Sequence, residues 1–124
     1  MVRFWGRHLM ISTSCQHLDS EPNYPRDCAR IVVWADSTPL ASADIAADRG
    51  SVTLQFAVTP GHLPRDARLD LLEAVFGLLG DEPSRSVRAT IPLGDCDLLV
   101  GLTRHLTDVR TRAAGATCLI DART

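Results

Sequence analysis

The strongest constraint in this 124-residue sequence is a change of hydrophobic period near its middle. Residues 51–58 alternate apolar and polar, which is typical of a strand with one buried face. From residue 65 to 79 the apolar residues follow the spacing of an amphipathic helix instead. A strand that leads into such a helix favours a sheet with helices packed on it. The predicted buried stripe of the helix is Leu69, Leu72, Val75, Phe76 and Leu79.

The first half of the chain is predicted to be a meander of strands. Residues 30–36, 40–46 and 51–58 are three strand segments separated by short turns, which favours antiparallel pairing. The segment 30–36 is apolar on both faces and is therefore expected at the centre of the sheet, with Trp34 in the core. Before it, residues 4–5 and 9–13 are short strand candidates, and residues 14–28 are rich in turn formers and predict a long loop.

The second half alternates helices and strands. Asp66 suits the first turn of the helix at 65–79, and Gly80 suits its C-cap. Residues 87–93 predict a strand, and Asp95 predicts the N-cap of a second helix that ends near residue 106. Its expected stripe is Leu99, Leu102 and Leu106, with Leu98 alongside. Residues 109–121 predict a last strand, bent at Gly115.

The expected fold class is therefore α/β (α+β), with a mixed, largely antiparallel sheet and two main helices. The element order is β, long loop, β-β-β, α, β, α, β. A mass of 13.5 kDa corresponds to one domain, residues 1–124. Within it, residues 1–28 are expected to be an irregular N-terminal segment with a short strand, and residues 29–124 to form the core.

Charge and composition exclude several activities. The net charge of −2 and the pI near 6.0 give no electrostatic footprint for nucleic acid, and no apolar run is long enough to span a membrane. All 13 basic residues are arginine, so a Schiff-base lysine and a P-loop lysine are both ruled out. With no signal peptide at the N-terminus, we expect a cytoplasmic protein with reduced cysteines.

From Arg30 onward, the order of elements resembles the core of the GNAT (Gcn5-related N-acetyltransferase) fold. The local match is the sequence Val58-Thr59-Pro60, similar to the V-x-P step that ends the family's strand before its acyl-CoA loop. The resemblance covers about three quarters of the chain. It implies an acyl-CoA ligand at the splayed end of the sheet, with the backbone of Val58 offered to the pantetheine arm.

The sequence also departs from the family's pattern. The pyrophosphate loop of the family is rich in glycine, because its backbone N–H groups must point at phosphate. Here the corresponding residues 61–68 contain Pro64, which lacks an N–H, and Asp66, which is negatively charged. The family's general-acid tyrosine is absent, since Tyr24 is the only tyrosine in the chain, and there is no room between residues 11 and 30 for the family's two N-terminal helices.

These features together predict a reduced, degenerate member that binds acyl-CoA or another small anionic ligand, with weak or no acetyl transfer. Acetyl-CoA and coenzyme A are the cofactors that the resemblance implies. His62 is the candidate general base, although an ordinary solvated loop histidine is the alternative. Arg65 and Arg68 are the residues expected to meet phosphate. His105, near the leucine stripe of the second helix, is a further candidate base.

A zinc site formed by cysteine and histidine residues is a further candidate. Cys15 and His17 form a close pair, but Cys28 has no near partner, and His8 would be needed as the fourth zinc ligand. We therefore predict thiols rather than a metal. Cys96 and Cys118 are expected to behave as small hydrophobic residues.

The alternative function belongs to another class, a non-catalytic homodimeric interaction module. Without the two N-terminal helices of the GNAT family, part of the sheet surface and the strand edges are left uncovered. Self-association is a common way to cover them. Trp5, beside Phe4, is a candidate docking residue. Arg110 and Arg112 share one face of the last strand and form either an anion site or a solvated face.

Overall fold

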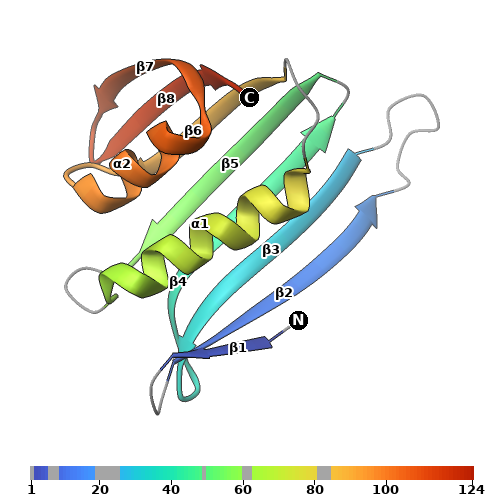
Figure 1. Cartoon of the computed structure of the whole chain (residues 1–124), viewed down its shortest axis with the longest axis vertical. Coiled ribbons are helices and arrows are strands. Elements are labelled where there is room, and N and C mark those ends of the chain that lie inside the picture. Colours follow the sequence, from blue (N-terminus) through green and yellow to red (C-terminus); the bar gives the residue numbers. More distant parts are fainter. Residues whose placement is uncertain (1, 6–8, 19–25, 49, 60–62, 81–84) are drawn as a thin grey trace.

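The fold is an eight-stranded sheet with two helices (Figure 1). The computed structural model describes residues 2–5, 9–18, 26–48, 50–59, 63–80 and 85–124. The strand order in the sheet is β1-β2-β3-β4-β5-β6-β8-β7. The strands are β1 (Val2–Trp5), β2 (Leu9–Leu18), β3 (Arg26–Ala35), β4 (Thr38–Asp48), β5 (Ser51–Val58), β6 (Ser86–Pro92), β7 (Thr107–Ala114) and β8 (Thr117–Arg123), and the helices are α1 (Arg65–Leu79) and α2 (Cys96–His105).

The sheet is mixed and largely antiparallel, as the sequence predicts. Strands β1 to β5 form an antiparallel meander. Helix α1 then crosses over the sheet and returns the chain as β6, which runs parallel to β5. β6 pairs on its other side with β8, and β7 lies at the edge. Both helices lie on the same side of the sheet (Figure 1).

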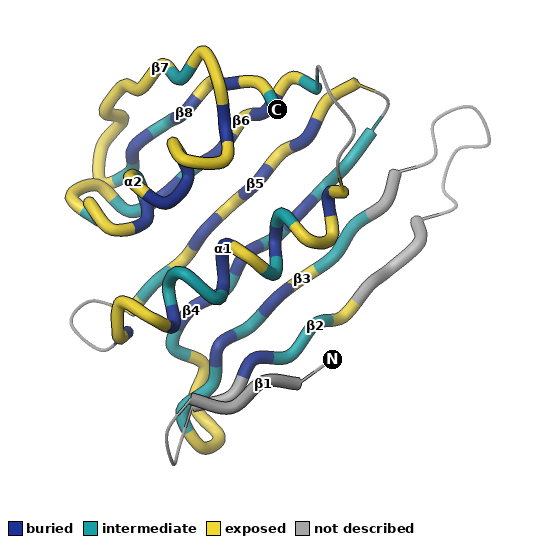
Figure 2. Tube along the Cα trace, in the orientation of Figure 1, coloured by how far each residue is buried: buried dark blue, intermediate teal, exposed yellow. Residues whose placement is uncertain are grey.

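The core lies between the sheet and the two helices. Every second residue of the inner strands is buried toward the helices, and Figure 2 shows this alternation along β5. In β3 the buried pair is Ile31 and Val33, both with no exposed surface. The alternation therefore turns Trp34 to the opposite face, where it is half-buried and its Nε1 donates to Ser12 Oγ at 2.8 Å. The prediction that Trp34 fills the core is wrong.

Helix α1 begins and ends where the sequence predicts, with Gly80 as C-cap at φ 72°. Its buried face is rotated, however. Leu69 and Phe76 are only half-buried, because α1 packs against both the sheet and α2 and so buries a broader face. The fully buried residues are Ala67, Leu71, Leu72, Val75 and Leu79.

Helix α2 has the predicted N-cap, since Asp95 accepts the backbone N–H of Leu98 at 3.2 Å. Leu102 and Leu106 are buried as predicted, whereas Leu98 is fully buried in place of Leu99, which is only partly buried. Gly101 is also buried and faces α1: a Cβ built there would lie 2.2 Å from Leu72 Cδ1. The two helices therefore touch through a glycine.

The long loop predicted for residues 14–28 is wrong at both ends. β2 continues to Leu18 and β3 begins at Arg26, with ten paired positions between the two strands. The turn-forming residues are concentrated in 19–25, which lie outside the described residues. In residues 14–18 and 26–28, the stabilisation from pairing between β2 and β3 outweighs the weak strand propensity of the local sequence.

The C-terminal strand predicted over residues 109–121 is a hairpin of two strands. β7 and β8 pair antiparallel, with Ala114 opposite Thr117. Gly115 lies at the first turn position with φ 62°, a conformation that glycine adopts without strain and that hairpin turns of two residues require. The predicted bend at Gly115 is thus a full reversal of the chain.

The sheet face opposite the helices is polar. Arg30 Nε donates to Asp44 Oδ1 at 2.6 Å, and Arg88 Nε to Asp121 Oδ1 at 3.4 Å. The hydrogen bond to Asp44, with the carboxylate charge as the second cause, raises the pKa of Arg30 above its ordinary value. These exposed pairs allow this face to remain in water. Neither helix in the described part of the chain is long and apolar enough to cross a membrane.

Candidate functional site

Strands β5 and β6 separate at their carboxyl ends. Their parallel pairing runs from Ser51↔Ser86 to Gln55↔Thr90 and stops there, although β5 continues to Val58 and β6 to Pro92. Beyond that point β5 follows β4, and β6 follows β8 as far as Pro92↔Thr117. In open α/β sheets, the space outside the carboxyl ends of diverging strands is where ligands bind.

The end of β5 presents backbone hydrogen-bonding groups to this gap. The Thr59 N–H donates to Leu40 O at 2.8 Å and so points toward β4. Backbone groups alternate in direction along a strand, so the N–H and C=O of Val58 point the opposite way, toward β6. No residue of β6 pairs with Val58. Val58 therefore offers a donor and an acceptor to a ligand that carries amide groups.

A cleft of about 390 Å³ opens at this gap. It lies between the ends of β5 and β6 and the beginnings of α1 and α2, and it is open to solvent. Its rim is the segment that leads from β6 into α2. The lining residues are Val58, Arg68, Pro92, Leu93, Gly94, Asp95, Cys96 and Asp97.

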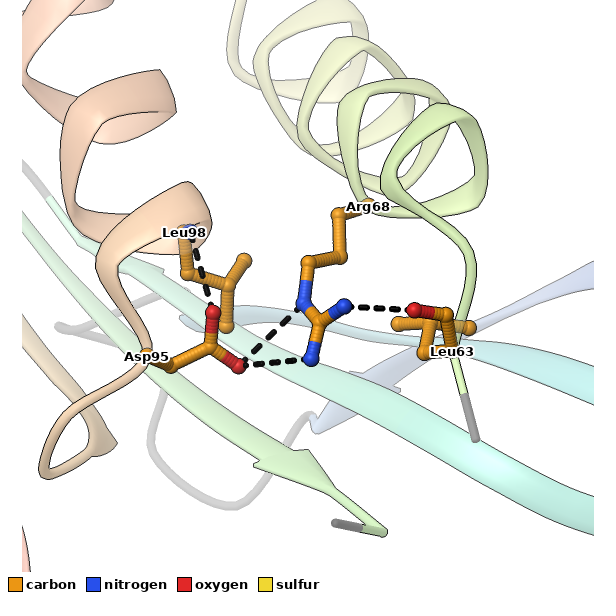
Figure 3. A network of polar contacts seen from close by, with 4 residues as sticks. All are labelled: Leu63, Arg68, Asp95 and Leu98. Carbon is orange, nitrogen blue, oxygen red and sulfur yellow. Dashed lines mark hydrogen bonds and ion pairs between the residues drawn. The ribbon is translucent and has the colours of Figure 1, made fainter. Parts of the chain in front are cut away.

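Arg68 and Asp95 join the two helices beside the cleft (Figure 3). Arg68 Nε and Nη2 each donate to Asp95 Oδ2 at 3.2 Å, and Arg68 Nη1 donates to Leu63 O. The Arg68 side chain is 16% exposed and that of Asp95 only 9%, so water screens the pair weakly. Because Asp95 Oδ1 also caps α2 at Leu98, one carboxylate positions the start of α2 against the start of α1.

The first turn of α1 is the other polar element near the cleft. Its N-cap is Pro64, which provides no side-chain hydrogen bond to the helix. The first backbone N–H groups of the helix, from Arg65 to Ala67, therefore have no such cap and form the donor set that an anion prefers. The carboxylate of Asp66 lies in the same turn and opposes a negatively charged ligand.

The residues predicted for the cofactor are only partly brought together. Val58 and Arg68 line the same cleft, whereas Arg65 is exposed and does not line it. Arg68 is already bonded to Asp95, so its charge is largely neutralised where phosphate was expected. His62, the predicted base, lies outside the described residues. Among the described residues, the cleft therefore presents the backbone groups of Val58 and an arginine that is already bonded to a carboxylate.

The sequence reasoning missed the opposite lip of the cleft. Asp95 was identified only as a helix cap, and its partner Arg68 is 27 positions away in the chain. Cys96, predicted to behave as a small hydrophobic residue, is exposed at the first position of α2 and lines the cleft. Cys118, for which the same prediction was made, is buried in the core. The exposure of Cys96 could have been predicted from its position directly after the N-cap Asp95, because side chains in the first turn of a helix often face solvent.

Other candidate residues lie elsewhere. His105 is at the far end of α2, where its ring stacks on Phe76 with centroids 4.3 Å apart, so it does not reach the cleft as a base. Arg110 and Arg112 are exposed on edge strand β7, opposite Asp121 and Leu119. This placement agrees with the solvated-face reading of these arginines.

A larger hollow, about 630 Å³, lies on the polar sheet face around Arg30 and Asp44. Its arginine and aspartate are bonded to each other, and it does not include the diverging strand ends. Among the described residues, no group of three or more His, Cys, Asp or Glu is placed to hold a metal ion. Cys15 and His17 lie on β2, opposite Ala29 and Asp27.

Comparison with known proteins supports the fold. No protein-family model matches the chain, and no curated protein matches it. Solved structures of similar fold include two that are each described as a "putative acetyltransferase". One, from Sphaerobacter thermophilus, is 16% identical with a TM-score of 0.59, over 97% of this chain and 94% of that one. The other, from Salmonella typhimurium and solved with its cofactor acetyl-CoA, is 14% identical with a TM-score of 0.52, over 82% of this chain and 64% of that one. At these identities the comparison identifies the architecture: the chain has a GNAT-like fold.

Proposed function

We propose that this chain binds an acyl-CoA through the cleft between β5 and β6, with weak or no acetyl transfer. The observation that carries the proposal is the backbone of Val58, which faces the gap where β5 and β6 no longer pair. The pantetheine arm contains two secondary amides and can bond to such a strand end as a short added strand. Support also comes from the acetyl-CoA bound in the Salmonella typhimurium protein of similar fold.

The weak catalysis follows from the residues around the cleft. When bound, an acyl-CoA supplies an activated thioester. The chain must then take a proton from the acceptor and give one to the leaving thiolate. Among the described lining residues, the ionisable side chains are Arg68, Asp95, Cys96 and Asp97. Arg68 and Asp95 are bonded to each other, so neither is available as an acid or base in this arrangement. Cys96 and Asp97 are exposed to solvent at the rim, where water rather than the protein sets their surroundings, so we expect them to contribute little.

The charge distribution makes the predicted affinity modest. Asp66 lies in the first turn of α1 and Asp97 on the opposite lip, and both repel the phosphates of coenzyme A. The donors that remain for phosphate are the first backbone N–H groups of α1 and the guanidinium of Arg65. The cytoplasm is the compartment that we propose, in keeping with Cys28, Cys96 and Cys118 as free thiols.

Equilibrium unfolding in urea, with and without coenzyme A and acetyl-CoA, tests the proposal. A ligand at 100 times its Kd should raise the unfolding free energy by about 2.7 kcal/mol. The matched variants are Leu93→Glu and Leu78→Glu, since both leucines are about half exposed, at 52% and 46%, and only Leu93 lines the cleft. Leu93→Glu should remove the stabilisation by ligand, and Leu78→Glu should retain it.

The proposal is wrong if millimolar ligand leaves the unfolding curve of the native sequence unchanged. It is also wrong if Leu78→Glu loses the ligand effect to the same extent as Leu93→Glu. Acetyl transfer itself is measured as release of free thiol from acetyl-CoA in the presence of a panel of amines. We expect a rate close to that of the uncatalysed reaction.

The alternative that we propose is a non-catalytic homodimer. The observation in its favour is the sheet face that the helices leave uncovered (Figure 2), which a second copy would cover through polar contacts, because its arginine and aspartate pairs are exposed. Light scattering across a range of concentrations tests it directly. A mass of twice 13.5 kDa, together with no response to coenzyme A, would favour the dimer.

A further inference from the structure

A second groove lies on the other side of the β5 end. It has a volume of about 370 Å³ and is formed by the beginning of β4 and the end of β5. Five of its seven lining residues are apolar, among them Pro39, Leu40, Ala57 and Val58. None of the described residues that line it carries a charge.

The groove and the cleft share one residue, Val58. The cleft lies on the β6 side of this residue and the groove on the β4 side. Ala57 belongs to the groove alone, because its side chain is exposed on the sheet face that the helices leave uncovered. A ligand that passes the backbone of Val58 through the gap therefore leaves the polar cleft and meets an apolar surface.

We propose that this groove receives the acyl chain of the thioester and that it selects chains longer than acetyl. The inference rests on the proposed acyl-CoA function and specifies its substrate class. The continuity through Val58 identifies the occupant, since the acyl group is the part of an acyl-CoA that follows the pantetheine arm. An acetyl group would leave most of the groove empty. A chain of four to six carbons would bury the exposed surfaces of Ala57 and Pro39.

The floor of the groove is fixed, so it is present before ligand binds. Val58 is paired with Ala41, and the bond from Thr59 N–H to Leu40 O extends the β4–β5 ladder beyond that pair. Leu40 and Val58 are half-buried and belong to the partly buried residues packed against the core. A preformed apolar surface costs little ordering on binding, so its affinity should increase with chain length.

The experiment is a calorimetric titration with coenzyme A, acetyl-CoA, butyryl-CoA and hexanoyl-CoA. We expect the Kd to fall by about twofold per methylene, the effect for a chain that is about half buried. Butyryl-CoA should then bind about fourfold more tightly than acetyl-CoA, and hexanoyl-CoA about sixteenfold more tightly. Affinities that agree within twofold across the three thioesters would overturn the inference.

A substitution pair locates the effect. Ala57→Gln places a polar side chain in the groove and should remove the dependence on chain length, while the Kd for coenzyme A stays within twofold. The matched control is Ala113→Gln, on an exposed alanine of edge strand β7, which should keep the full dependence. Equal slopes in the two variants would show that the chain does not lie in this groove.

Failure of the inference is distinguishable from failure of the proposed function. If coenzyme A binds and the acyl chain adds nothing, the cleft is a cofactor site and the groove is not an acyl site. If neither coenzyme A nor any thioester binds, the proposed function itself is wrong, and the inference is overturned with it.

Discussion

Arg68 and Asp95 form a mostly buried ion pair that connects the beginnings of both helices at the mouth of the cleft. The same carboxylate accepts two guanidinium N–H groups and the backbone N–H of Leu98. The pair therefore has two opposing consequences. It fixes the geometry of the cleft, and it occupies Arg68, the cation among the described residues that line the cleft, which an anionic ligand would need.

The first prediction concerns stability. Asp95→Ala removes the helix cap and leaves Arg68 without its partner, so we expect a loss of about 2 to 3 kcal/mol in unfolding free energy. Asp95→Asn keeps a capping side chain and should cost about 1 kcal/mol less. Urea unfolding measures both. Equal losses would mean that the cap contributes nothing.

The second prediction concerns ligand affinity. Asp95→Asn removes the negative charge that neutralises Arg68, so coenzyme A should bind about three- to tenfold more tightly at low salt. The gain should shrink as salt is added, because the cleft is open to solvent. The double variant Arg68→Gln with Asp95→Asn is the control, and it should lose the gain. A gain that survives in the double variant would assign the effect to another group.

The third prediction uses the first turn of α1. Asp66→Asn removes a charge that repels phosphate there, and should tighten coenzyme A binding by about threefold. Asp108→Asn, on exposed strand β7, makes the same change in net charge far from the cleft. Calorimetry on both variants separates a local effect from a general one. Identical gains would show that only net charge matters.

The fourth prediction contrasts two helical glycines. Gly101→Ala gains helix propensity but forces a methyl group to 2.2 Å from Leu72 Cδ1, in a helix contact that is buried. Overpacking should win, with a net loss of about 1 to 2 kcal/mol. Gly77→Ala has open space around it and should stabilise the protein by about 0.5 to 1 kcal/mol. Thermal and urea unfolding check both, and a stabilised Gly101→Ala would contradict the packing.

The fifth prediction concerns the exposed edge of the sheet. Arg110 and Arg112 lie on β7, and charged residues on an edge strand hinder pairing with another sheet. Replacing both with valine should produce concentration-dependent oligomers, seen by light scattering, with little change in unfolding free energy. Arg104→Val, on an exposed position of α2, is the control for lost charge and should leave the oligomeric state unchanged.

The sequence by itself determined the period of each element and most of the order. The alternation over residues 51–58 and the helix over 65–79 match β5 and α1 at both ends, because these segments have one buried face and clear boundaries. Asp95 and Gly80 were identified as caps, since capping depends on local backbone groups. The GNAT resemblance implied a ligand at the splayed end of the sheet beside Val58, and the strands do separate there.

Tertiary structure decided the rest. Pairing between strands extended β2 and β3 into a predicted loop and made one predicted strand into the β7–β8 hairpin. It also turned Trp34 away from the helices, because the register of β3 is set by its neighbours. The bond between Arg68 and Asp95 joins residues that no sequence period relates. Local patterns encode the type and boundaries of an element that has one clear apolar face. The face that a strand apolar on both sides buries, and the contacts between distant elements, are decided only when the chain is packed.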